Sequence, residues 1–192
     1  GEIEKLTNYT QRKRNLELRK KMFEDKEDEE SIKELERLEQ LYTLGDVSFD
    51  SLIIIDFGSN LKSVLTSLVY TDVDQEKVLI TTVNQWFDES IFYENTIKDL
   101  YYPSVNYKEF KRYNEKYFAE YNIFPNEITI LTYDALGLIY YTWKQKGMIR
   151  SINDFSFKSK IKGKIGTFSF KNQKVIQELD IYKTDNKKFI KF

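Results

Sequence analysis

Apolar residues recur at spacings of three and four through the charged stretch that opens the chain, residues 1–44. This spacing predicts a pair of helices, or one long helix, with a single apolar stripe that includes Leu35 and Leu38. Ser31 and Glu34 fit a capping box at the start of the second helix. We therefore expect a helical arm over this stretch.

The pattern changes after Gly45 to that of an α/β fold. An apolar, β-branched run at 52–55 predicts a strand buried on both faces of a parallel sheet. Residues 61–68 have helical spacing, with Ser59 or Asn60 as the expected N-cap, and a second apolar run ends at Thr82. Strand, helix and strand in this order predict a βαβ unit.

The second half of the chain alternates helical and extended patterns. Tyr101 and Tyr102 predict a short third strand, and 106–121 predicts a helix with an aromatic side. A helix over 128–146, capped by Asn126 or Thr129, is apolar nearly all round, so we expect it to be covered on more than one side. The C-terminal pattern predicts three antiparallel strands, at 165–170, 175–182 and 188–192, with turns at 171–174 and 184–187.

The composition narrows the chemistry. Histidine and cysteine are both absent, which excludes Ser-His-Asp triads, thiol nucleophiles and the usual zinc sites. Lys and Arg number 30 against 31 for Asp and Glu, so a nucleic-acid partner is not expected. We expect no enzyme, no catalytic residue, no metal and no cofactor.

Two loops at one edge of the predicted sheet are candidate sites, because open α/β sheets bind ligands beyond the carboxyl ends of their strands. As a ligand rim they offer Phe57, Gly58, Ser59, Asn84, Gln85 and Trp86. Turn formation and packing explain the same residues without a ligand. A second hypothesis is a metal or acid-base site formed by Asp56, Asp88 and Glu89.

Two further features have packing explanations. The 14 tyrosines and 14 phenylalanines could form a stacking surface, but most recur at helical spacing, which favours packing. A basic run at Lys158, Lys160, Lys162 and Lys164 alternates as in an exposed loop or an edge strand.

Three segments in this order resemble the C-terminal part of type 1 periplasmic binding proteins, the group like the Leu/Ile/Val-binding protein. They are 132–138 (TYDALGL), 162–170 (KGKIGTFSF) and a strand pair that ends at Lys183. Segments 49–55, 61–68 and 80–86 are most similar to the penicillin-binding protein activator branch. The chain departs from that pattern at Asp56, where a proline is usual, and at Thr81 or Thr82, where a glycine is common.

The resemblance implies an open, mainly parallel sheet flanked by helices, with an N-terminal helical arm and a C-terminal antiparallel strand set. It divides the chain into an arm of the second lobe (1–44), a βαβ core of that lobe (45–105), return elements of the first lobe (106–170) and closing strands (171–192). The rest of the first lobe would precede Gly1, so the chain is expected to be a C-terminal fragment. Free sheet edges would then be available to pair two copies as a homodimer.

The function implied is non-enzymatic regulation of a peptidoglycan synthase, a penicillin-binding protein, through protein contact with the arm. The resemblance also implies a periplasmic location, with the full-length form anchored to the outer membrane as a lipoprotein, and a structural role for Asp134 as an acceptor near its helix start or from a neighbouring loop. The alternative is a receptor for amino acids or amides that delivers them to an ABC transporter permease. A flavodoxin-like enzyme that uses carboxylates is a third hypothesis, which the lack of histidine and of glycine-rich loops disfavours.

Overall fold

The computed structural model describes residues 1–92, 99–172 and 174–192. Two units follow from its contacts. Unit 1 contains Gly1–Val83, Asp88–Tyr101 and Thr184–Lys188. Unit 2 contains Asn84–Phe87, Tyr102–Lys183 and Phe189–Phe192. The four segments expected from the resemblance stay a prediction.

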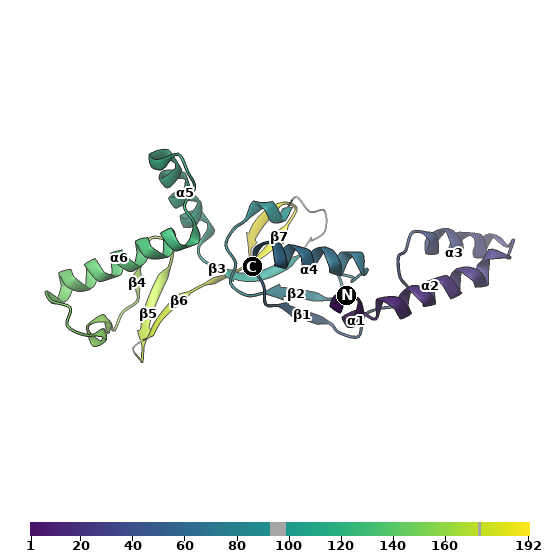
Figure 1. Ribbon diagram of the computed structural model, residues 1–192, viewed down its shortest axis with the longest axis horizontal. Coiled ribbons are helices and arrows are strands. Elements are labelled where there is room, and N and C mark those ends of the chain that lie inside the picture. Colours follow the sequence, from purple (N-terminus) through teal and green to yellow (C-terminus); the bar gives the residue numbers. More distant parts are fainter. Residues whose placement is uncertain (93–98, 173) are drawn as a thin grey trace. The chain divides into compact units, whose positions relative to one another are not determined.

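Unit 1 begins with the predicted helical arm. A short helix, α1 (Glu2–Leu6), precedes α2 (Tyr9–Glu24) and α3 (Glu29–Glu39), which lie side by side (Figure 1). The pair of helices is confirmed, but the cap of α3 lies three residues earlier than predicted. Asp28 is the N-cap and accepts a hydrogen bond from the Ser31 amide at 2.9 Å. The helix therefore begins at Glu29, and the acids Glu29 and Glu30 lie in its first turn.

Arg12 joins the arm to the rest of unit 1. Its buried guanidinium donates to the carbonyl oxygens of Gly45 (2.8 Å), Thr71 (2.9 Å) and Asp72 (2.8 Å). Thr71 is the C-cap of the helix α4 (Gly58–Tyr70). Arg12 therefore satisfies carbonyls that the end of a helix leaves without an intrahelical partner.

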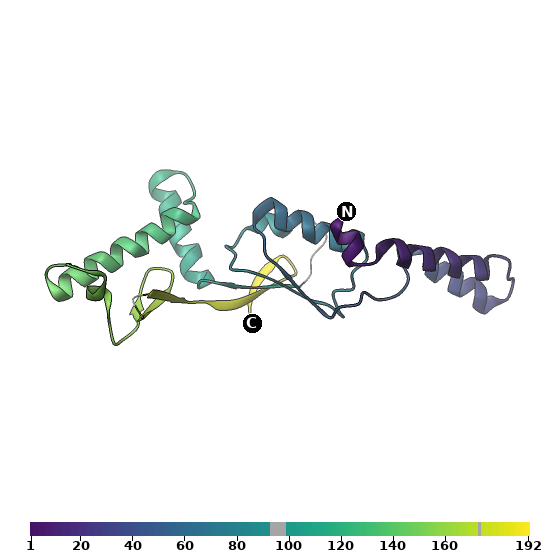
Figure 2. The same ribbon diagram turned by 60° about the horizontal axis from the view of Figure 1, so that its bottom comes forward.

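The predicted βαβ unit is confirmed. β1 (Ser51–Ile54) and β2 (Leu79–Thr82) are parallel, with Ser51 opposite Leu79, and α4 lies over them (Figures 1 and 2). The helix begins at Gly58 with Phe57 as N-cap, so the prediction of Ser59 or Asn60 was wrong. Gly58 adopts a φ of 54°, which its missing Cβ allows, and this starts the helix before Ser59.

The prediction that the first strand is buried on both faces was wrong. Ile54, Ile80 and Thr82 are buried on the face that α4 covers. On the opposite face Ile53 is 68% exposed and Ile55 is 78% exposed, because no described residue covers them. Half of the apolar run thus remains in contact with solvent.

The larger sheet has the order β1-β2-β3-β7-β8, with β3 at Leu100–Ser104, β7 at Asp180–Asp185 and β8 at Lys188–Lys191. β3 is the predicted third strand and runs parallel to β2. β7 and β8 form a hairpin whose turn residues, Asn186 and Lys187, both have positive φ, as a type I′ turn requires. The α/β class is confirmed, but the hairpin makes the sheet mixed rather than mainly parallel.

Unit 2 has a second sheet and two helices, α5 (Tyr107–Tyr121) and α6 (Glu127–Lys146). β4 (Ile161–Lys162), β5 (Thr167–Lys171) and β6 (Lys174–Glu178) are antiparallel in the order β4-β5-β6. Two 3-10 helices, η1 (Glu89–Phe92) in unit 1 and η2 (Ile152–Phe155) in unit 2, complete the described elements.

The predicted C-terminal tail was right in its two hairpins, β5 with β6 and β7 with β8, but wrong in treating the middle run as one strand of a single three-stranded sheet. The apolar run at 175–182 is divided between β6 and β7, which belong to different sheets. A single residue, Leu179, separates these two strands, so the sequence pattern is nearly continuous across the break. Gln173, in the predicted turn at 171–174, lies outside the described residues.

An aromatic cluster forms much of the core of unit 2. The ring of Phe87 lies 4.7–6.3 Å from five other rings, those of Tyr102, Tyr107, Phe110, Tyr182 and Phe189. The Tyr182 hydroxyl accepts a hydrogen bond from the Tyr107 amide at 3.0 Å. Burial raises the pKa of Tyr102. For these tyrosines the prediction of a packing role is confirmed.

Candidate functional site

The helix α6 of unit 2 is apolar on most sides but buried on one side only. It buries the row formed by Ile130, Asp134 and Thr142. Its other sides expose eight large apolar residues: Ile128, Leu131, Tyr133, Leu136, Ile139, Tyr140, Tyr141 and Trp143. The prediction that this helix is covered on more than one side was wrong for the described part of the chain, which supplies packing partners for one row only.

Asp134 is the acid in the buried row of α6, and its task is structural. One carboxylate oxygen accepts the Lys164 amide at 2.5 Å, and the other accepts the Ile165 amide at 3.2 Å. Gly163 comes so close that a Cβ built on it would lie 2.8 Å from the Asp134 carboxylate. The expectation that Asp134 accepts hydrogen bonds from a neighbouring loop is confirmed.

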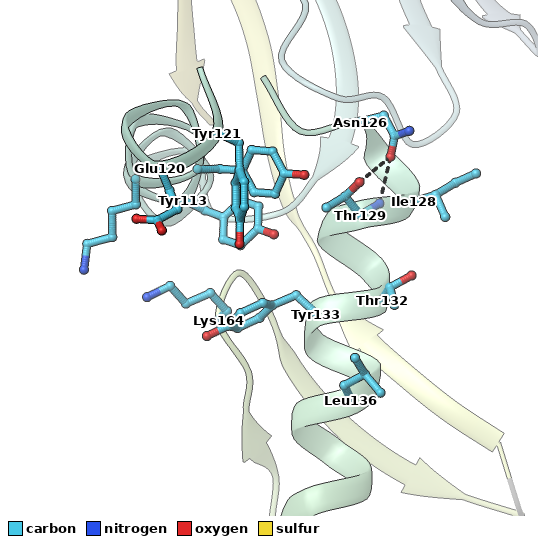
Figure 3. Close-up of a pocket in the computed structure, with 12 residues that line it drawn as sticks. Tyr113, Glu120, Tyr121, Asn126, Ile128, Thr129, Thr132, Tyr133, Leu136 and Lys164 are labelled. Atoms are coloured by element: carbon cyan, nitrogen blue, oxygen red, sulfur yellow. Dashed lines mark hydrogen bonds between the residues drawn. The ribbon is translucent and has the colours of Figure 1, made fainter. Parts of the chain in front are cut away.

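A groove between α5 and α6 has a volume of about 630 Å³ (Figure 3). Tyrosines form much of it: Tyr113, Tyr117 and Tyr121 come from α5, and Tyr133 comes from α6. The remaining lining residues are Lys116, Glu120, Asn126, Ile128, Thr129, Thr132, Leu136 and Lys164. We call this space the tyrosine groove.

Helical spacing positions the tyrosines. Residues 113, 117 and 121 are four apart, so their side chains share one side of α5, with ring centroids 6.1 Å and then 4.6 Å apart. The Tyr113 and Tyr133 rings meet edge to face at 5.5 Å. Tyr113 is only 6% exposed, whereas Tyr121 is 60% and Tyr133 is 53% exposed. The groove is therefore aromatic at its base and aromatic where it opens to solvent.

The turn between the helices fixes one end of the groove. Asn122 ends α5 with a φ of 56°. Asn126 then caps α6, and its side-chain oxygen accepts the Thr129 amide at 2.8 Å and the Thr129 hydroxyl at 2.7 Å (Figure 3). Of the two predicted caps, Asn126 is therefore the cap and Thr129 is a donor to it.

The charged residues that line the groove are Lys116 and Glu120 from α5 and Lys164 from the loop after Gly163. Figure 3 shows Lys164 beside Tyr133, on the side that faces α5. Lys164 follows Gly163 in the loop that Asp134 holds, so a buried carboxylate positions its backbone. Burial raises the pKa of Tyr113, and the neighbouring Tyr117, Tyr133 and Asp134 raise it further. Tyr113 thus remains a neutral hydrogen-bonding phenol at neutral pH.

The six residues predicted as a ligand rim belong to different units. Phe57, Gly58 and Ser59 are exposed at the N-terminus of α4 in unit 1. Asn84, Gln85 and Trp86 belong to unit 2, where the Trp86 ring packs 5.7 Å from the ring of Phe110 and the Gln85 amide donates to the Pro103 carbonyl. Their convergence on one ligand stays a prediction.

The predicted carboxylate site also has a structural explanation at Asp88. Burial raises the pKa of Asp88, but hydrogen bonds from Ser90 and Lys62 outweigh this effect and leave the pKa below its usual range. Its carboxylate lies 3.2 Å from the Lys62 ammonium. Asp56 and Glu89 are not grouped with it in a cation site, since the described residues contain no cluster of three or more metal-ligating side chains.

The tyrosine groove was missed by sequence reasoning. Its signal was the recurrence of tyrosine every four residues in α5, which packing explained equally well. Only the position of α6 opposite this row distinguishes a lined groove from a buried face.

Comparisons with known proteins add no relative. No protein-family model matches the chain, and neither the curated proteins nor the solved structures contain a match. Within the described ranges no helix combines the length and the hydropathy needed to span a membrane.

Proposed function

We propose that the chain belongs to a protein of the type 1 periplasmic-binding fold that acts in the bacterial periplasm by binding another protein, without catalysis. The proposed partner is a peptidoglycan synthase, a penicillin-binding protein whose activity this contact regulates. The resemblance of the sequence to the activator branch supports the identity of the partner. The exposed apolar side of α6 supports action through contact with another protein.

The observation that carries the proposal is the apolar surface of α6. Large contiguous apolar surfaces on a soluble protein typically mark contact sites. Trp143 is 56% exposed and Tyr140 is 59% exposed, and tryptophan and tyrosine are enriched at protein interfaces. Fully burying a large apolar side chain contributes about 1.5–3 kcal/mol, so covering these half-exposed residues stabilises a complex by about half of that value each, before the entropic cost of association is subtracted. α6 is therefore a stronger candidate contact than the charged arm expected from the sequence.

The test measures binding of the chain to purified penicillin-binding proteins by biolayer interferometry. Ile139→Glu and Trp143→Glu put a charge on the exposed side of α6, and we expect each to weaken binding at least about tenfold. Val175→Glu is the control, because Val175 in β6 is 52% exposed and lies outside α6.

Leu18→Glu and Met22→Glu test the arm in the same experiment, because both residues are exposed on α2. If these variants lose binding and the α6 variants do not, the arm is the contact. Failure of every penicillin-binding protein to bind the unaltered chain would contradict the proposed partner.

The second candidate is a receptor for amino acids or amides. One observation favours it: α4 begins without a side-chain cap and with Phe57 and Ser59 exposed, so its first backbone N–H groups can receive an anionic ligand group. The test is thermal unfolding with each free amino acid and amide. A rise in melting temperature that Ser59→Pro removes would support the receptor, and no rise with any of these ligands would contradict it.

A further inference from the structure

We infer that the tyrosine groove is a saccharide-binding site that prefers sugar chains bearing carboxylates. The groove shares Ile128, Tyr133 and Leu136 with the exposed side of α6, but Ile139 and Trp143 lie outside it, and the proposal does not require a protein partner. The volume of the tyrosine groove, about 630 Å³, lies within the range of small-molecule sites, about 300–1,000 Å³.

The walls of the groove match the mixed surface of a sugar. A pyranose ring has an apolar C–H face and a rim of hydroxyl groups. Tyrosine offers the same combination, since its ring is apolar and its hydroxyl is polar. Tyr121 and Tyr133 present such groups to solvent at the opening, with Tyr113 between them at the base.

The opposite wall adds hydrogen-bonding groups. Thr132 on α6 and Asn126, the N-cap of that helix, both line the groove; the Asn126 side-chain oxygen forms the cap, whereas its amide nitrogen takes no part in it. An apolar helix or peptide in this space would cover these groups without satisfying their hydrogen bonds. The lining thus favours a ligand rich in hydroxyl and amide groups.

The charges favour an acidic sugar over a neutral one. Lys116 and Lys164 line the groove against a single acid, Glu120, so the lining carries one net positive charge. Neither ammonium group makes an ion pair within 4.0 Å in the described part of the chain. Lys164 is the better placed, because Asp134 fixes its backbone beside Tyr133. One net charge is far fewer than the several phosphate contacts that nucleic-acid binding uses.

The experiment compares two probes by isothermal titration calorimetry. One is an oligosaccharide of alternating N-acetylglucosamine and N-acetylmuramic acid, and the other is the same oligosaccharide after reduction of its carboxylates to alcohols. We expect the acidic form to bind about tenfold more tightly, because only that form pairs with the lysines.

Variants of the lining residues test whether the probes bind in the groove. Tyr121→Ala and Tyr133→Ala each remove a stacking surface, and we expect each to weaken both probes about tenfold. Lys164→Gln should weaken the acidic probe and leave the reduced probe unchanged. Tyr140→Ala is the matched control, since Tyr140 is 59% exposed on α6 and does not line the groove.

Three results would overturn the inference: no binding of either probe, equal affinity for the two probes, or binding that the groove variants do not alter. Circular dichroism of each variant confirms that the helices remain folded. Ile139→Glu, which tests the protein contact, lies outside the groove, so the two proposals can fail independently.

Discussion

At the scale of single residues, two charged side chains hold parts of this chain together through backbone groups. Arg12 donates to three carbonyl oxygens, and Asp134 accepts from two amides of one loop. Both side chains are buried, and a buried charge is tolerated only when its hydrogen bonds are satisfied. Each therefore fixes the position of segments that are distant in the sequence.

Arg12→Lys should destabilise the chain although the charge is kept. A lysine has one ammonium group in place of the planar fork, so it cannot reach all three of the Gly45, Thr71 and Asp72 carbonyls. We expect a loss of about 2–4 kcal/mol in the free energy of unfolding, measured by urea denaturation. Arg14→Lys, at an exposed position of the same helix, should change it by less than about 0.5 kcal/mol. Equal effects at both positions would contradict the role of Arg12.

Two glycine substitutions should have opposite effects. A Cβ on Gly163 would lie 2.6 Å from the Phe168 ring and 2.8 Å from the Asp134 carboxylate, so Gly163→Ala should cost about 1–3 kcal/mol of stability. A Cβ on Gly137 meets nothing within 4 Å in the middle of α6, so Gly137→Ala should add about 0.5–1 kcal/mol. Thermal unfolding shows whether each substitution stabilises or destabilises the chain. A stabilised Gly163→Ala variant would show that the loop around Gly163 does not pack as described.

At the scale of elements, α3 illustrates how one cap makes a helix sensitive to pH. Hydrogen bonds from the Ser31 side chain and then from the Ser31 amide lower the pKa of Asp28. Because the folded pKa lies below the unfolded value, ionised Asp28 contributes stability at higher pH. That contribution is lost as the pH falls from about 3.9 through the folded pKa.

Acid should therefore loosen the start of α3, and NMR can follow this through hydrogen exchange of the Ser31 amide. Asp28→Asn is the control, because asparagine also caps a helix but does not titrate in this range. We expect the Ser31 amide to lose protection below about pH 3.9 in the unaltered chain and to show a smaller change in the variant. An identical pH profile in the two proteins would assign the effect to another group.

At the scale of the whole molecule, each unit leaves one apolar surface uncovered by the described residues. Unit 1 exposes Ile53 and Ile55 on one face of its sheet, and unit 2 exposes the side of α6 that includes Ile139 and Trp143. β1 also lies at an edge of the larger sheet, where unpaired backbone groups favour association between chains. The predicted homodimer through free sheet edges remains a prediction that this arrangement makes testable.

The double variant Ile53→Thr, Ile55→Thr should lower self-association with little effect on folding. Threonine keeps the β-branched shape that suits a strand, and both positions face solvent, so stability should change by less than about 0.5 kcal/mol at each. Ile54→Thr, between them, should cost about 2–4 kcal/mol, since Ile54 is 6% exposed. Light scattering measures association and urea denaturation measures stability. A double variant as destabilised as Ile54→Thr would mean that this face is buried in the chain.

The sequence by itself determined the elements of the chain and several of its local contacts. Periodicity alone predicted α5, α6 and the unit formed by β1, α4 and β2, because the side-chain period of a helix or a strand is a local property. It also identified Asn126 as a candidate cap, and the resemblance gave Asp134 a structural task. The N-caps observed at Asp28 and Phe57 lie a few residues before the predicted ones, since several neighbouring residues can begin the same helix.

Only the tertiary structure decided which apolar residues are covered and which strands pair. The run at 175–182 contributes to two sheets, and this depends on partners far away in the sequence. The same holds for Ile53 and for α6, because an apolar pattern shows that a residue can be buried but does not show that anything lies over it. The tyrosine groove exists because α6 stands opposite a row of rings on α5, and that juxtaposition is a property of packing rather than of spacing.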